Sequence, residues 1–233
     1  QGILGMWTVT LKLLPIVITS HLLGGFATLT LLLLSYFSLR RSSSQATSQI
    51  NNSKAAGLRN LAALALVVVV LQIALGGWTS ANYAALVCPQ LPACEGDWQS
   101  QLDFAEAFEI RPPTEAGYQY GVLDYGARMT IHISHRIGAL ITLLILASLI
   151  WQLARHGRGA YFSRLNLALA GVLCLQLCLG LANIVMHLPL AIAVAHNGVA
   201  ALLLLTVVTL NYRLYRVRRR RSVDNHTKLS FAT

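Results

Sequence analysis

Three histidines, His21, His135 and His196, lie inside long apolar runs, where ionisable side chains are costly and by default suggest a function. His135 falls about six residues into its run and His196 about seven residues into another. At a rise of 1.5 Å per residue, both imidazoles lie roughly 10 Å from the ends at which the two runs begin. Two imidazoles at equal depth on different helices of one bundle can coordinate opposite faces of a planar metal macrocycle. Imidazole is a standard axial ligand of haem iron, so this pair predicts bis-histidine haem ligation.

The motif IHISHRIG around His135 supplies further candidates. His132 lies one helical turn earlier on the same face, and could be a substitute ligand, a neighbour that supports the ligand, or a partner of a haem propionate. Arg136 and Arg128 lie near the outer end of the run, where guanidinium groups could pair with haem propionates. For Arg136, extension toward lipid headgroups explains the residue equally well. For His135 and His196, the alternative is a hydrogen-bonded pair between helices without a metal.

The elements that must position these residues are membrane helices. Of the 233 residues, 55% are hydrophobic and only 11% are charged, which is too little charge for a water-facing surface. A further span is indicated by residues 1–11, which have the composition of its tail. Five runs are long enough to cross a hydrocarbon core of ~30 Å, and they cover residues 14–38, 58–80, 129–153, 162–186 and 189–215. The predicted fold class is therefore an all-α polytopic membrane protein.

Charge in the connecting segments predicts the orientation of the chain. The net charge of +10 could suggest nucleic acid, but the basic residues cluster in short segments between apolar runs and at 213–221. This pattern is typical of cytoplasmic loops and tails, so we expect membrane lipids and no nucleic acid as partners. The segments 39–59 and 154–164 are basic, whereas 81–128 is acidic. We therefore place loop 81–128 outside and the C-terminus in the cytoplasm.

The remaining histidines and the cysteines are interpreted by location. His187 falls in a short outer turn, and His156 and His226 fall in cytoplasmic segments, so none of the three is expected to bind a metal. Cys88 and Cys94 lie six residues apart in the outer loop, where an oxidising compartment permits a disulfide. A metal pair is the alternative, although this loop holds no further Cys or His. The other two cysteines, Cys174 and Cys178, are expected to be small buried packing residues.

An internal repeat relates the two ends of the chain at a constant offset of 175 residues. Residues 1–25 align without gaps on 176–200, which pairs His21 with His196. Both segments begin with Q-x-x-L-G, and this motif occurs once more at Gln72–Gly76. Chance similarity between apolar segments is the alternative. If the repeat is real, its unit is four spans, and the earlier copy is represented only by its last helix and the tail of the helix before it.

The repeat predicts the domain organisation. We expect a remnant of an N-terminal bundle at 1–38, a cytoplasmic linker at 39–57, a complete four-helix bundle at 58–215 with the outer loop 81–128, and a basic cytoplasmic tail at 216–233. The first residue is Gln rather than Met, so the chain is expected to start partway through a longer protein.

Four quoted segments carry a resemblance to a known family: GMWTVTLKLLPIVITSHLLGG, LQIALGGWTSANYAALVCPQLPAC, IHISHRIGAL and AVAHNGVAALLL. Together they resemble the haem A synthase family of bacterial and mitochondrial inner membranes, and a proteobacterial member most of all. The resemblance implies eight transmembrane helices in two pseudo-symmetric bundles. It implies that the second bundle holds haem b between His135 and His196. It also implies that the first bundle binds haem O and oxidises its C8 methyl to the formyl group of haem A, which serves cytochrome oxidase biogenesis.

The same resemblance implies roles for individual residues. His21 matches one of the two axial histidines of the substrate bundle, and Cys88 and Cys94 match a cysteine pair of the outer loop. The other substrate-side histidine and the glutamate before it have no counterpart in this sequence. No catalytic residue can therefore be named, and the fragment alone is expected to be inactive. His132 takes the place that the glutamate holds in the first copy. A haem O synthase and a second copy of the chain are possible partners.

Two other functions are compatible with intramembrane histidines. A di-histidine b-type cytochrome would relay electrons without converting haem O. A proton-coupled transporter would use the histidines to relay protons and would bind no haem.

Overall fold

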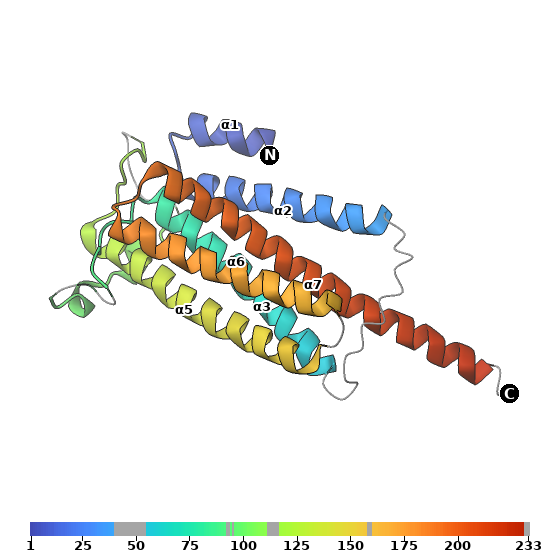
Figure 1. The fold of residues 1–233 in the computed structure, drawn as a ribbon. Coiled ribbons are helices and arrows are strands. Elements are labelled where there is room, and N and C mark those ends of the chain that lie inside the picture. The colour runs from blue at the N-terminus through green and yellow to red at the C-terminus, as the bar shows by residue number, and fades with distance from the viewer. Residues whose placement is uncertain (40–54, 92–93, 95, 111–116, 158–159, 231–233) are drawn as a thin grey trace.

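The computed structural model describes residues 1–39, 55–91, 94, 96–110, 117–157 and 160–230, and these residues form helices and connecting turns without a β-strand (Figure 1). The linker predicted at 39–57 lies mostly outside them. The helices are α1 (Gly2–Thr10), α2 (Pro15–Leu39), α3 (Ala55–Ala81), α4 (Phe104–Ala107), α5 (Tyr125–His156), α6 (Ala160–Val185) and α7 (Leu190–Ser230), with a 3-10 turn η1 at Gln99–Gln101.

Five of these helices are long and apolar enough to cross a membrane, and they confirm the five predicted spans and the polytopic all-α fold. They are α2, α3, α5, the segment Phe162–Val185 of α6 and the segment Leu190–Tyr215 of α7. Beyond Tyr215 the backbone of α7 stays helical to Ser230, so residues 216–230 of the predicted basic tail continue the last span without a break.

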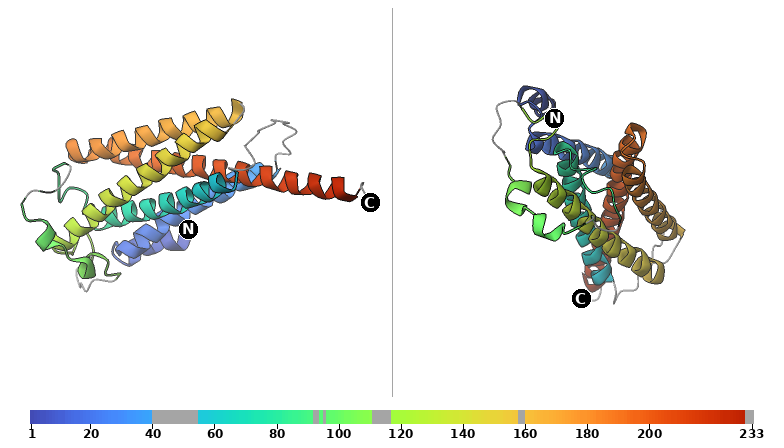
Figure 2. Two further views of the ribbon diagram at one scale, coloured as in Figure 1. Left: turned by 90° about the horizontal axis from the view of Figure 1, so that it is seen from below. Right: turned by 90° about the vertical axis from the view of Figure 1, so that its left-hand side faces the viewer.

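The helices α3, α5, α6 and α7 form a four-helix bundle. In cyclic order α3 contacts α5, α5 contacts α6, α6 contacts α7, and α7 contacts α3. The helices α5 and α7 therefore stand at opposite corners, as the view from the loop end shows (Figure 2, right). His135 on α5 and His196 on α7 consequently approach the bundle from opposite sides.

The main cluster of buried residues ends at Ile73 on α3 and Leu173 on α6, and it begins at Leu146 on α5 and Leu203 on α7. Smaller buried clusters around Trp78 and Met129 pack the end of the bundle near the outer loop. On α5, His135 lies between Ile131 of one small cluster and Leu146 of the main core. On α7, His196 precedes the first main-core residue, Leu203.

The first two helices pack beside this bundle. The helix α2 contacts α3 and α7, whereas α1 packs on α2 (Figure 1). Close approach of α2 to α3 depends on Gly77, where an added Cβ would lie 2.8 Å from Leu22 Cδ2. Near the other end of α2, the ring of Phe37 stacks on Tyr212 of α7 with ring centroids 4.9 Å apart. Both contacts hold α2 along the outside of the four-helix bundle.

The outer loop is fastened to the bundle end by hydrogen bonds. Trp78 Nε1 donates to the Ala107 carbonyl at 2.9 Å, and Thr130 Oγ1 accepts from the Asp103 amide at 2.9 Å. The loop also reaches the turn between α1 and α2, where the Tyr118 amide donates to the Lys12 carbonyl at 2.9 Å. The loop and the α1–α2 and α6–α7 turns lie at one end of the molecule (Figure 1).

The expectation that Cys174 and Cys178 are buried packing residues is wrong. Both are exposed free cysteines on the outward surface of α6. The physical reason is that lipid is as apolar as a helix interface, so an apolar residue in a span need not turn inward.

Candidate functional site

His135 on α5 is held by three residues of α3 and α5. Gln72 Nε2 lies 3.0 Å from His135 Nδ1 and also donates to the His135 carbonyl at 3.0 Å. Gly76, one turn after Gln72, faces the edge of the ring, and a Cβ added there would lie 3.2 Å from His135 Cε1. Gly138 makes room for the Gln72 carboxamide, because a Cβ at this position would collide with Gln72 Oε1. Because Gln72 contacts Nδ1, the opposite ring nitrogen, Nε2, stays clear of this glutamine.

His196 on α7 meets α6 through the same pair of residue types. Gln176 Nε2 lies 3.2 Å from His196 Nε2, and a Cβ added at Gly180 would lie 3.2 Å from His196 Cε1. His196 Nδ1 and Gln176 Oε1 are both buried without a hydrogen-bond partner. The edge of this imidazole is therefore packed against Gly180, and only one of its two nitrogens has a hydrogen-bond partner.

His21 on α2 repeats the arrangement against α1. Gln1 Nε2 donates to the His21 carbonyl at 3.1 Å, and a Cβ added at Gly5 would lie 3.2 Å from His21 Cε1. Gly24 lies beside Gln1 Oε1 as Gly138 lies beside Gln72 Oε1. His21 Nδ1 is buried without a partner. Each Q-x-x-L-G motif thus packs on one of the three intramembrane histidines.

The three glycines also lie at the same distance from the ends of their helices. Gly5, Gly76 and Gly180 precede the last residues of α1, α3 and α6 by five residues each, which is about 7.5 Å along a helix axis. The histidines themselves lie at different distances from the starts of their helices, since His135 is ten residues into α5 and His196 is six residues into α7. The difference arises because α5 begins at Tyr125, before its apolar run. The three imidazoles therefore contact their partner helices at a common level.

The turns after these helices share one backbone conformation. Lys12 and Leu13 have φ of 52° and 65°, and His187 and Leu188, 175 residues later, have φ of 58° and 61°. The Leu13 amide donates to the Thr8 carbonyl and the Leu188 amide to the Asn183 carbonyl, at 2.9 and 2.7 Å. After α3 the turn is similar, since Tyr83 has φ of 54°. The two helices that follow, α2 and α7, begin 175 residues apart, as α1 and α6 end.

His132 and Arg136 connect the histidine region to the outer loop. His132 is buried, and its Nδ1 donates to the Ala84 carbonyl at 2.8 Å. Arg136 donates to the carbonyls of Cys88 at 2.5 Å and Gln90 at 2.8 Å, and its Nη1 lies 3.5 Å from Cys88 Sγ. Its guanidinium thus turns to the loop and not to the headgroup region. Sequence reasoning had considered propionates and headgroups for Arg136 and had missed the loop.

Cys88 and Cys94 form a disulfide with their Cα atoms 5.3 Å apart, which confirms the pairing predicted for the outer loop. Cys88 is almost fully buried and packs with Met129 of α5. Because Arg136 binds the Cys88 carbonyl, the residue after His135 is tied directly to this disulfide loop.

The other candidate residues lie at the periphery. Arg128 is half-buried on α5, and its Nε is buried without a hydrogen-bond partner. His187 is exposed in the α6–α7 turn, and His156 is the last residue of α5 at the opposite end of the bundle. The side chain of His226 lies outside the described residues. Neither His187 nor His156 is brought to the intramembrane group.

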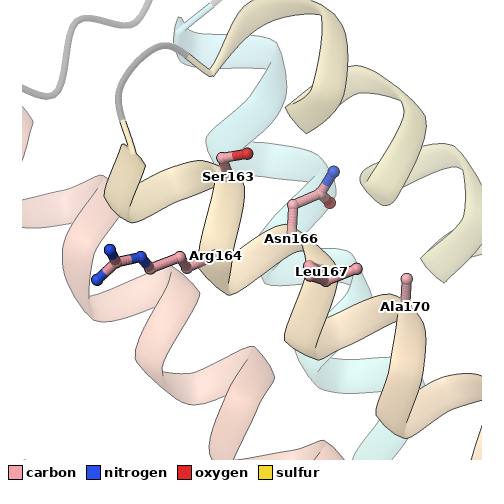
Figure 3. A pocket seen from close by; sticks show the side chains of 5 residues that line it. All are labelled: Ser163, Arg164, Asn166, Leu167 and Ala170. Atoms are coloured by element: carbon pink, nitrogen blue, oxygen red, sulfur yellow. The ribbon is translucent and has the colours of Figure 1, made fainter.

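A shallow hollow of about 350 Å³ lies elsewhere on the molecule (Figure 3). Its lining comes from the first turns of α6 and comprises Ser163, Arg164, Asn166, Leu167 and Ala170. Gly180, which contacts His196, lies ten residues beyond Ala170 on the same helix, about 15 Å along its axis. The hollow is therefore distinct from the histidine site.

The histidine region has the features that a haem requires. Two imidazoles stand on opposite corners of the bundle, each before the first main-core residue of its helix. Each ring edge lies against a glycine, where an added Cβ would be only 3.2 Å from Cε1. The residues present thus fit a bis-histidine haem.

Sequence reasoning had found the repeated Q-x-x-L-G motif but had not given it a partner. The signal was its recurrence in three helices, each followed by an intramembrane histidine on the next long helix. Only the fold shows that the glutamine and the glycine contact that histidine.

Comparison with known proteins identifies the family. The family model described as "Cytochrome oxidase assembly protein" matches residues 1–208. A protein of Shewanella oneidensis named "Heme A synthase" is 53% identical over 218 residues, which are 92% of this chain and 63% of the relative. Proteins of the same name from Methylobacterium radiotolerans and Beijerinckia indica are 32% and 29% identical, over 69% and 67% of this chain and 41% of each relative. The chain spans less than two thirds of the length of these relatives. It belongs to the cytochrome oxidase assembly protein family, together with these haem A synthases.

Proposed function

We propose that this chain is part of a haem A synthase, an oxidoreductase that converts the C8 methyl of haem O to the formyl group of haem A. Family membership supports the proposal, because the curated relatives carry this name. The substrate is a large, planar and apolar macrocycle, which suits a site between helices inside a membrane.

We further propose that the bundle of α3, α5, α6 and α7 holds a haem b with His135 and His196 as its axial ligands. The observation that carries this proposal is the placement of the two imidazoles at opposite corners of the bundle, each before the first main-core residue of its helix. When bound, haem b supplies one-electron redox chemistry. The chain's own residues hold the two imidazoles in place.

His21 is proposed as a ligand of the substrate haem in the preceding bundle. The support is geometric, since His21 and His196 lie at the offset of the repeat, each after the same turn and each against a glycine. His21 Nδ1 also lacks a hydrogen-bond partner, so the ring has a nitrogen free for a supporting contact.

His132 and Arg136 are proposed to organise the mouth of the haem b site rather than to ligate iron. Both use their polar atoms to fix the outer loop, His132 at Ala84 and Arg136 at Cys88 and Gln90. The loop thereby closes the end of the bundle nearest the histidines. We place this end outside, with the C-terminus in the cytoplasm, on the basis of the acidic loop and the basic connections. A haem O synthase that delivers substrate, and a second copy of the chain, remain proposed partners.

The experiment that tests the function uses the full-length protein with both bundles in cells that make haem O. Haem is extracted and separated by chromatography. The proposal expects haem A from the unaltered protein, and loss of haem A with accumulation of haem O in His21→Ala. A His156→Ala variant controls for removal of an imidazole outside the site and should make haem A normally. Haem b in the protein without any haem A would instead favour a b-type cytochrome, and a colourless protein would favour a transporter.

A further inference from the structure

Two glutamines in the bundle contact the proposed haem ligands in different ways. Gln72 lies at Nδ1 of His135 and also bonds its carbonyl, whereas Gln176 lies at Nε2 of His196. Nε2 is the nitrogen that His135 leaves for a metal. The same residue type therefore leaves the coordinating nitrogen open at one histidine and occupies it at the other.

The residue three positions after each histidine explains this difference. Gly138 follows His135 and Gly24 follows His21 at this spacing, and both leave space for the glutamine carboxamide beside the histidine carbonyl. The equivalent residue after His196 is Val199, which is buried. Val199 carries the Cβ that glycine lacks at positions 138 and 24, and we attribute to it the different position of the Gln176 carboxamide, which lies at the ring nitrogen.

We propose that Gln72 is a positioning residue that holds His135 ready to bind iron. The Gln176 side chain, by contrast, must move away from His196 before this histidine can bind iron. The proposal rests on the proposed bis-histidine haem b site. It makes His135 the first ligand to engage and His196 the second.

The chemistry of the carboxamide suits both roles. A histidine that binds a metal through Nε2 carries its proton on Nδ1 and needs an acceptor there. Gln72 Oε1 is buried without a partner, so a turn of the amide presents this oxygen to Nδ1. At His196, the 3.2 Å contact between Gln176 Nε2 and His196 Nε2 is lost when the ring nitrogen turns to iron.

The two glutamines therefore give opposite predictions when each is changed to leucine in the 233-residue chain. Loss of a residue that orients a metal ligand typically lowers metal affinity about 10- to 100-fold, so Gln72→Leu should bind haem that much more weakly. Its low-spin electron paramagnetic resonance signal should also shift, because the His135 ring is no longer fixed. Gln176→Leu removes a competing hydrogen bond of ordinary strength and should bind haem about 2- to 13-fold more tightly, with an unchanged low-spin signal.

The experiment titrates haem b into the purified protein and follows the Soret band, then records the resonance spectrum of each saturated sample. Gln152→Leu is the matched control, since Gln152 is half-buried at the far end of α5. Gly138→Ala should also weaken haem binding, because it displaces the Gln72 carboxamide without altering His135. It keeps the test decisive if Gln72→Leu does not fold.

Weaker binding in both leucine variants, or no change in either, would overturn the inference while leaving the haem b site intact. Failure of the proposed function gives a different result, because the unaltered chain would then bind no low-spin haem at all.

Discussion

The close contact between Gly76 and His135 predicts that adding one methyl group at position 76 will disturb the histidine. In Gly76→Ala the new Cβ would lie 3.2 Å from His135 Cε1, whereas ordinary carbon contacts are 3.4–4 Å. Because Cε1 belongs to the imidazole ring that Gln72 contacts, the ring must shift by a few tenths of an ångström. Overpacking of this kind costs about 1–3 kcal/mol. Gly180→Ala presents the same 3.2 Å contact to His196 Cε1.

The cost falls mainly on the haem-bound state, because an unligated ring can move aside and a ligated ring cannot. At 1.36 kcal/mol per factor of ten, the expected loss of haem affinity is about 5- to 160-fold in each variant. Haem titration of the purified chain measures this loss, and the low-spin spectrum reports the altered ligand geometry.

Gly57→Ala and Gly171→Ala are matched controls on α3 and α6. An added Cβ meets no atom within 4 Å at either position, so both variants should bind haem like the unaltered chain. Their helices should become slightly more stable, because alanine is favoured over glycine in a helix by up to ~1 kcal/mol. Equal haem affinity in Gly76→Ala and Gly57→Ala would show that the glycine does not set the position of the ring.

Three further predictions follow from other contacts. Arg136→Ala removes the hydrogen bonds to the Cys88 and Gln90 carbonyls, so limited proteolysis should cut the outer loop faster than in Arg128→Ala, and equal rates would contradict this anchoring role. Asn211→Ala removes the hydrogen bond from Nδ2 to the Ala62 carbonyl between α7 and α3, and thermal unfolding should show a loss of about 1–2 kcal/mol with an unchanged haem spectrum. Cys174 and Cys178 should react with a lipid-soluble maleimide in membranes while Cys88 and Cys94 do not, and protection of the first pair would mean that another helix covers this face of α6.

The apolar runs predicted the spans well because a membrane requires long uninterrupted helices, and length with composition is enough to find them. The prediction was less accurate at the start of α5. That helix begins at Tyr125, within a segment whose mixed composition does not indicate a span, because the outer loop packs on its first turns through Thr130. The local amino-acid composition cannot predict that a distant loop will pack on these turns and stabilise them.

Contacts between distant segments explain the rest of what the sequence could not predict. Gln72 and His135 are 63 residues apart, with the outer loop between them, so their pairing depends on how α3 and α5 lie side by side. Arg136 finds the Cys88 carbonyl only because the disulfide loop folds back onto α5. The direction of Cys174 and Cys178 was mispredicted because an apolar face in lipid gives no signal of which way it turns.

The central claim is that His135 and His196 ligate one haem b in this chain. The most direct measurement is the electron paramagnetic resonance spectrum of the purified 233-residue protein, together with His135→Ala and His196→Ala. We expect a low-spin bis-histidine signal in the unaltered chain and its loss in each variant, with the signal of His187→Ala unchanged. An undiminished low-spin signal in both His135→Ala and His196→Ala would contradict it.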